Sequence, residues 1–195
     1  MGQILRSYRS REHPGTAKKA EAHLGGSGLN LLINNARVMP ESTLESATAA
    51  DMLAMYKINV VGPMFTGQAF LPLLKKAEQK STQTGLSCSK AAIINVSTIG
   101  GSIGNTPRLA TFPVISYRCT KAALNMLTRC QSVTHKEDWI LCIALHPGWV
   151  KTELGTAKAE LTVEDSVQGI LKVLSTLSEK HHGIIVDWTE RTVPW

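Results

Sequence analysis

A tyrosine and a lysine four positions apart, Tyr117 and Lys121, begin a segment with a helical pattern, SYRCTKAALN. Residues at this spacing lie on neighbouring turns of one helix face, so the lysine ammonium can lie beside the phenol. A free tyrosine ionises near pH ~10, and a cation beside it in a dry cleft would favour the phenolate and lower the pKa. The pair predicts proton-transfer chemistry if a cleft surrounds it; otherwise the two residues merely share a helix face.

The elements around this pair alternate between strands and helices. Nearly continuous apolar segments at 29–36, 91–97, 139–148 and 183–188 predict strands that are buried on both faces of a parallel sheet. Helical patterns cover about 46–77, 113–134 and 163–179, and Thr162 with Asp165 three residues later predicts an N-terminal cap for the last of these. This alternation predicts a doubly wound α/β sheet.

Polar and small residues gather where three of these strands end. The ends carry Asn34 and Asn35, then Ser97 and Thr98, and then Pro147, Gly148 and Thr152. Ligands of such sheets bind at the carboxyl ends of the strands, so this edge is the predicted site. The alternative is chance, because turns favour the same residue types.

The composition is that of one globular domain. The chain has 195 residues, of which 43% are apolar and 18% are charged. It contains no apolar run long enough to span a bilayer and no secretory signal, so we expect a cytoplasmic protein that binds neither membrane nor nucleic acid; a mitochondrial transit peptide is a weaker alternative. The cysteines and histidines lack metal-site spacing, so we expect reduced thiols and no metal.

The net charge of +6 is concentrated at the N-terminus, where residues 1–23 form a basic arm. We expect this arm to be a solvated terminus, with contact to nucleic acid or an acidic membrane as the alternative.

The segments LLINNA, INVVGPM, AAIINVS, YRCTKAALNM and LHPGWVKTEL follow one another along the chain. With them, the range from about Leu24 to Trp195 resembles the short-chain dehydrogenase/reductase family, most nearly the sniffer and C-factor-like carbonyl reductases. The resemblance implies a Rossmann-type fold, reduction of a small carbonyl substrate or oxidation of an alcohol, and NADP as cofactor with NAD as the alternative. It also implies a homodimer built through the two long helices.

The resemblance assigns catalytic roles to five residues. Tyr117 would exchange a proton with the substrate oxygen, and Lys121 would lower the pKa of the tyrosine and hold the nicotinamide ribose. Asn59 would support a water-mediated proton relay; the alternative is an asparagine that satisfies helix backbone groups. Ser97 and Thr98 match a Ser-Ser pair whose second member orients the substrate.

Further matches concern the binding of the cofactor. The segment at 34–36 would lie along the cofactor, with stabilisation of the sheet as the alternative, and the segment at 147–152 would contact the nicotinamide end. The residues that match in these two segments are Asn34, Asn35, Ala36, Pro147, Gly148, Val150 and Thr152.

The chain departs from the family pattern in three places. Arg37 stands where the family has a glycine, and Thr98 stands where it has a serine. No glycine-rich turn follows a first strand, and the glycines at 25–28 precede a strand, so they predict a loop. We therefore predict an incomplete Rossmann-type domain that lacks the first β-α-β-α-β portion, with weakened cofactor binding. A non-catalytic interaction protein and an unstable fragment are the alternatives.

The missing portion has a consequence for the strand predicted at 29–36. Without neighbours on one side it would form an edge of the sheet, and it is apolar and carries no charge before Arg37. Such an edge predicts self-association through residues 29–36 unless the arm or a partner covers it.

Overall fold

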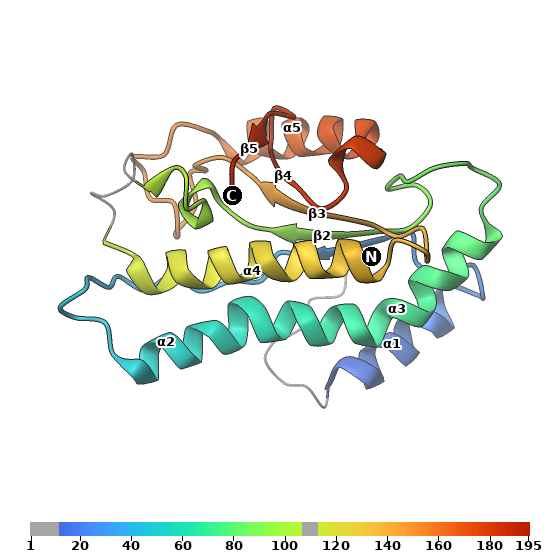
Figure 1. The fold of residues 1–195 in the computed structure, drawn as a ribbon, viewed down its shortest axis with the longest axis horizontal. Coiled ribbons are helices and arrows are strands. Elements are labelled where there is room, and N and C mark those ends of the chain that lie inside the picture. Colours follow the sequence, from blue (N-terminus) through green and yellow to red (C-terminus); the bar gives the residue numbers. More distant parts are fainter. Residues whose placement is uncertain (1–11, 107–112) are drawn as a thin grey trace.

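One five-stranded sheet forms the centre of the molecule (Figure 1). The computed structural model describes residues 12–106 and 113–195. The strands lie side by side in the order β1-β2-β3-β4-β5. The first four are parallel to one another and the last is antiparallel to β4. They are β1 (Leu31–Asn34), β2 (Ala92–Val96), β3 (Leu141–His146), β4 (Ile185–Asp187) and β5 (Thr192–Val193).

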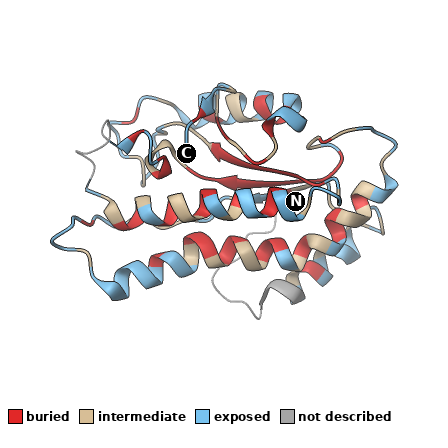
Figure 2. Cartoon of the chain, in the orientation of Figure 1, coloured by how far each residue is buried: buried red, intermediate tan, exposed pale blue. Residues whose placement is uncertain are grey.

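Helices cover both faces of the sheet, which confirms the predicted α/β class. Helices α1 (Glu12–His23), α3 (Gly62–Lys80) and α4 (Ile115–Thr134) lie on one face and α5 (Val163–Thr176) lies on the other (Figure 1). Alternate residues of β2 therefore enter different apolar cores: Ile93 packs with the α3 side and Ile94 with the α5 side. Both side chains are fully buried, as is the whole of β2 (Figure 2), and each such burial stabilises the fold by roughly 1.5–3 kcal/mol.

The helix predicted at 46–77 is observed as one continuous run with an irregularity. It begins as α2 (Ala49–Tyr56), passes through the π-helical segment η1 (Lys57–Val61) and continues as α3. Thr48 caps its start by accepting a hydrogen bond from the backbone N–H of Asp51. A π-helical turn inside a helix changes which residues face the core, and here it contains Asn59, which is buried.

The cap predicted for α5 is present. The Thr162 hydroxyl accepts from the backbone N–H of Asp165, and the Asp165 carboxylate accepts from the backbone N–H of Thr162, which together form a capping box. The remaining short helical turns are η2 (Ile99–Gly101) and η4 (Glu179–His181). None of the described helices is long and apolar enough to cross a membrane.

The second half of the basic arm forms α1. Ala17 is buried in the same core as Leu32 and Leu74, while Lys18 and Lys19 on the same helix are exposed. A simple solvated terminus was the expectation here, and the small apolar residues of this segment give it a packed face instead. Arg6, Arg9 and Arg11 lie outside the described residues.

Strand β1 lies at the edge of the sheet. It pairs with β2, and no other described strand pairs with it. On the α5 side of the sheet, Ile33 is 45% exposed, whereas Leu31 of the same strand packs against the core on that side. The predicted edge is therefore present within the described part of the chain.

Candidate active site

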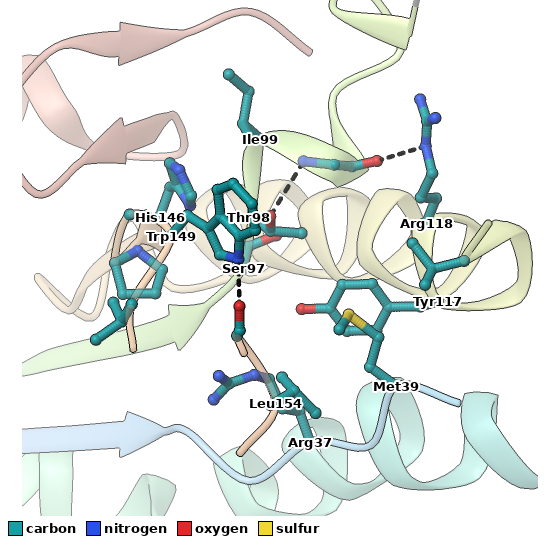
Figure 3. A pocket seen from close by; sticks show the side chains of 16 residues that line it. Arg37, Met39, Ser97, Thr98, Ile99, Tyr117, Arg118, His146, Trp149 and Leu154 are labelled. Carbon is teal, nitrogen blue, oxygen red and sulfur yellow. Dashed lines mark hydrogen bonds between the residues drawn. The ribbon is translucent and has the colours of Figure 1, made fainter. Parts of the chain in front are cut away.

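A cavity of about 310 Å³ opens at the carboxyl ends of β1, β2 and β3 (Figure 3). Each element that surrounds it contributes a short stretch of chain. Arg37 and Met39 follow β1, Ser97 to Gly100 follow β2, Tyr117 and Arg118 begin α4, and His146 to Val150 end β3 and continue beyond it. The strand-end location predicted for the site is where the structure has its cavity.

Tyr117 occupies the first turn of α4 and presents its phenol to the cavity (Figure 3). The residue is only 6% exposed. Burial raises the pKa of Tyr117 to about 12, because the phenolate would lose hydration, and the positive charge and hydrogen bonding of Arg37 only partly oppose this. The phenol therefore keeps its proton at neutral pH.

Lys121 lies one turn further along α4 and behind the tyrosine. Its Nζ donates a 2.7 Å hydrogen bond to the carbonyl oxygen of Val96 and lies 5.6 Å from the centre of the Tyr117 ring. The side chain is 1% exposed and is not among the described residues that line the cavity. Burial, followed by the nearby charge of Arg37, lowers the pKa of Lys121 to about 7.

The two pKa values differ from the simple expectation for a tyrosine beside a cation. The pKa of Tyr117 is raised and not lowered, because burial destabilises the phenolate more than the charge of Arg37 stabilises it. Lys121 is itself partly neutral near pH 7, so it supplies less charge than an exposed lysine would. The spacing predicted the proximity of the two groups, but it could not predict how deeply both are buried.

Arg37 is the fixed cation of the site. Its side chain lines the cavity close to Tyr117 (Figure 3), and its charge affects the pKa of both Tyr117 and Lys121. No acidic side chain of the described residues forms an ion pair with it. The departure from the family pattern at position 37 thus places a guanidinium beside the proposed proton donor.

Ser97 and Thr98 both line the cavity, but their hydroxyls have different partners. The buried Ser97 hydroxyl donates a 2.6 Å hydrogen bond to the Asn125 side-chain oxygen. The Thr98 hydroxyl accepts a 3.1 Å bond from the backbone N–H of Gly100 and caps η2. Since Thr98 accepts in that bond, its own O–H is left to donate to a ligand.

Asn59 lies away from the cavity lining and joins three segments. Its side-chain amide donates to the carbonyl oxygen of Val38 and to the hydroxyl of Thr120, each at 3.0 Å. Its side-chain oxygen accepts from the backbone N–H of Val38, also at 3.0 Å. These bonds fix the chain after β1 against η1 and α4, which favours a structural role for Asn59 over a relay.

At the end of β1, Asn34 contacts the sheet, whereas the next two residues face the solvent. Asn34 donates a 2.8 Å hydrogen bond to Asn95, whose amide in turn donates to side chains of α4, so Asn34 stabilises the sheet. Asn35 and Ala36 are exposed and do not line the cavity.

The loop after β3 forms one wall. Pro147, Gly148 and Val150 line the cavity, whereas Thr152 is exposed and accepts from the backbone N–H of Gly155. Gly148 has a φ of +83°, and a side chain there would run into Leu161 and Trp188. Its glycine is therefore required both by backbone conformation and by space.

Two lining residues in this loop, His146 and Trp149, received no role from the sequence. Trp149 donates a 2.7 Å hydrogen bond to the carbonyl oxygen of Gly155 and faces the cavity (Figure 3). The Nδ1 atom of His146 is buried without a partner among the described residues, and burial lowers the pKa of His146 to about 4 against the opposing charge of Asp187. Both residues flank the Pro-Gly turn, so their position at the end of a predicted strand is the sequence feature that could have marked them as site residues.

Tyr117 and the loop at 147–150 line one cavity, and the buried Lys121 lies behind the tyrosine, where its Nζ donates to the Val96 carbonyl oxygen. The glycines at 25–28 form the turn between α1 and β1, ahead of the strand, as predicted. Within the described part of the chain, the adjacent glycines that follow β2, at 100–101, lie in the short helical turn η2 and do not begin a longer helix that could receive a pyrophosphate.

Comparison with known proteins gives consistent results. Residues 8–162 match the family model described as short chain dehydrogenase. The short-chain dehydrogenase srdF of Neurospora crassa is 36% identical over 199 residues, which cover 95% of this chain and 73% of the relative. The C-signal protein of Myxococcus xanthus is 33% identical over 168 residues, which cover 86% of this chain and 93% of the relative.

Two solved structures are also similar. An NADPH-bound carbonyl reductase from chicken fatty liver shares 47% identity with a TM-score of 0.92, over 98% of this chain and 75% of that chain. The carbonyl reductase Sniffer of D. melanogaster shares 32% identity with a TM-score of 0.94, over 99% of this chain and 77% of that chain.

Proposed function

Because the chain belongs to the short-chain dehydrogenase family, we propose that it reduces the carbonyl group of a small compound with NADPH. The family and the similar NADPH-bound carbonyl reductase from chicken fatty liver support an oxidoreductase that uses a nicotinamide cofactor. The roles of individual residues and the choice of NADP over NAD belong to the proposal.

The observation that carries the proposal is the phenol of Tyr117 at the wall of the cavity (Figure 3). Carbonyl reduction adds a hydride to the carbon and a proton to the oxygen. A reduced nicotinamide cofactor supplies the hydride when bound. Tyr117 supplies the proton, because its pKa of about 12 keeps the phenol in the donor form at neutral pH.

The neighbouring side chains position the carbonyl and support the tyrosine. The free O–H of Thr98 donates to the substrate oxygen and holds it near the phenol, while the buried bond from Ser97 to Asn125 fixes the strand end behind it. Lys121 and Arg37 stabilise the phenolate that the proton transfer leaves. With a pKa of about 7, Lys121 also returns a proton at neutral pH.

The test is the loss of NADPH absorbance in the presence of a carbonyl compound, comparing the wild-type chain with Tyr117→Phe. Removal of a general acid reduces turnover by about 10²- to 10⁴-fold. The substitution removes one oxygen and almost no volume, so the thermal unfolding midpoint should stay close to that of wild type. Equal turnover in the two proteins would exclude Tyr117 as the donor.

A non-catalytic interaction protein is the second candidate. It is favoured by the absence, in the described ranges, of a pyrophosphate-binding turn and by the unpaired outer edge of β1. Calorimetric titration with NADPH separates the two: saturable binding supports the reductase, and no binding at millimolar concentration supports the interaction protein.

A further inference from the structure

The cavity carries positive charge and, among the residues that the structure describes, no acidic side chain lines it. Arg37 and Arg118 both contribute to its wall. Arg118 donates through Nε to the carbonyl oxygen of Gly100 at 3.2 Å, and its guanidinium points away from Tyr117 (Figure 3), so Arg37 is the cation nearer the phenol. A concave site with this charge favours an anionic ligand.

Arg37 lies in the cavity wall without an acidic partner among the described residues. It is half-buried, and the ionisable groups on which its charge acts are the Tyr117 phenol and the Lys121 ammonium. A partly desolvated guanidinium gains most from a carboxylate or phosphate, which can accept two of its hydrogen bonds at once.

The remaining wall limits the shape of the ligand. Met39, Val114, Trp149 and Leu154 give an apolar lining with one aromatic ring. The volume of about 310 Å³ suits a small molecule rather than a peptide. The ligand therefore combines a compact apolar or aromatic body with one anionic group.

The positions of Arg37 and Tyr117 in the cavity limit how far the anionic group of a ligand can lie from its reacting carbonyl group. Because Arg37 and Tyr117 line the same cavity and the charge of Arg37 acts on the phenol, a group bound by Arg37 lies near the group that reacts at Tyr117. A carboxylate directly bonded to the carbonyl carbon satisfies both positions.

We propose that the cavity selects 2-oxo acids with an apolar side chain, with Arg37 binding the carboxylate while Tyr117 and Thr98 face the keto oxygen. This substrate class rests on the proposed carbonyl reduction. The reaction adds a hydride to the keto carbon and the Tyr117 proton to its oxygen, which yields the 2-hydroxy acid and leaves the carboxylate unchanged. The reduced cofactor is the source of the hydride.

The test measures binding by titration calorimetry with phenylglyoxylate and with its uncharged methyl ester, using the full chain. A charge-assisted pair predicts that wild type binds the acid about 10- to 100-fold more tightly than the ester. Arg37→Gln should remove this preference and Arg37→Lys should retain part of it. Arg191→Gln is the matched control, because Arg191 is exposed on the turn before β5, and it should retain the full preference.

Three results would overturn the proposal. They are equal binding of acid and ester by wild type, an unchanged preference in Arg37→Gln, and no binding of either compound at millimolar concentration. Nicotinamide mononucleotide tests the other source of an anion: if Arg37→Gln weakens the binding of this phosphate but not that of phenylglyoxylate, Arg37 serves the cofactor and the substrate assignment is wrong.

The same variants separate this inference from the proposed function. Tyr117→Phe should keep the preference for phenylglyoxylate over its methyl ester, because the contact between Arg37 and the carboxylate remains, while turnover is lost. Acid binding that depends on Arg37 in a wild-type chain without turnover would refute the reductase and keep the anion site. Turnover of neutral ketones without preference for the acid would support the reductase and refute the anion site.

Discussion

At the scale of single residues, the site depends on three groups whose charges are coupled. Tyr117 and Lys121 are both buried, which holds the phenol protonated and brings the lysine pKa to about 7. Arg37 is the cation whose charge acts on both of them. The family resemblance gave Lys121 the role of lowering the tyrosine pKa, whereas the group that opposes the rise of the Tyr117 pKa in this chain is Arg37.

The buried lysine predicts a pH dependence of stability. Its pKa is about 7 in the folded chain, below the unfolded value of 10.5, so the folded state holds fewer protons between these values and stability rises with pH through this window. Lys121→Met removes this dependence. Its stability relative to wild type should fall by roughly 2 kcal/mol between about pH 7 and about pH 8.5.

The measurement is urea denaturation of both proteins at each pH. Loss of the hydrogen bond to the Val96 carbonyl lowers the free energy of unfolding of Lys121→Met by the same amount at every pH. The test is therefore the difference in slope between the two proteins when the free energy of unfolding is plotted against pH. A difference between the two proteins that does not change with pH would mean that Lys121 is hydrated or charged in the folded state.

At the scale of elements, the hydrophobic pattern gave the strands and helices well, because most of them are buried on a regular period. Predicted strands at 91–97 and 139–148 are observed as β2 and β3, and the capping box before α5 was visible in the sequence. The pattern did not predict α1, whose apolar residues are small, or β5, which has only two residues. The π-helical turn around Asn59 leaves no periodic signal either.

The site was predictable to the extent that it lies at strand ends. Ser97, Thr98, Tyr117, Pro147, Gly148 and Val150 line one cavity, as their positions after or between strands suggested. The sequence could not show that the Asn59 amide binds the Val38 carbonyl oxygen or that the Asn34 amide binds Asn95 in the sheet. In both cases the partner lies in a distant segment of the chain.

The turn between α1 and β1 provides a test of how tightly α3 packs. Gly28 has a φ of +87°, and a side chain there would run into the backbone of Ala77 in α3. Gly25 has a φ of +54° and open space around it. Gly28→Ala should therefore cost roughly 2–5 kcal/mol of stability and Gly25→Ala roughly 1–2 kcal/mol, as measured by urea denaturation. Equal costs would show that this turn does not pack against α3 as described.

At the scale of the whole molecule, the exposed edge of β1 predicts self-association. Ile33 is 45% exposed on the α5 side of the sheet, whereas Leu31 of the same strand packs into the α5-side core. Ile33→Lys should shift the chain toward smaller species in light scattering, because a charge on an edge strand opposes pairing between chains. Leu31→Lys would also damage the core, so Ile33 is the better choice.

The control for this experiment is Leu44→Lys. Leu44 is 78% exposed in the loop before α2, away from the strand edge, so the same charge change there should leave the oligomer size unaltered. A wild-type chain that is already a monodisperse monomer would refute the edge argument. A dimer that persists in Ile33→Lys would favour association through α3 and α4, which stays a prediction.

The central claim is that this cavity transfers a proton from Tyr117 to a carbonyl oxygen while hydride enters the carbon. The most direct measurement supplies NADPH deuterated at the transferring position together with phenylglyoxylate and a neutral aryl ketone, and follows deuterium in the alcohol product by mass spectrometry. We expect one deuterium in the product with wild type and at least about 100-fold less product with Tyr117→Phe. A wild-type chain that binds NADPH yet forms no deuterated alcohol, or equal product from the two proteins, would contradict it.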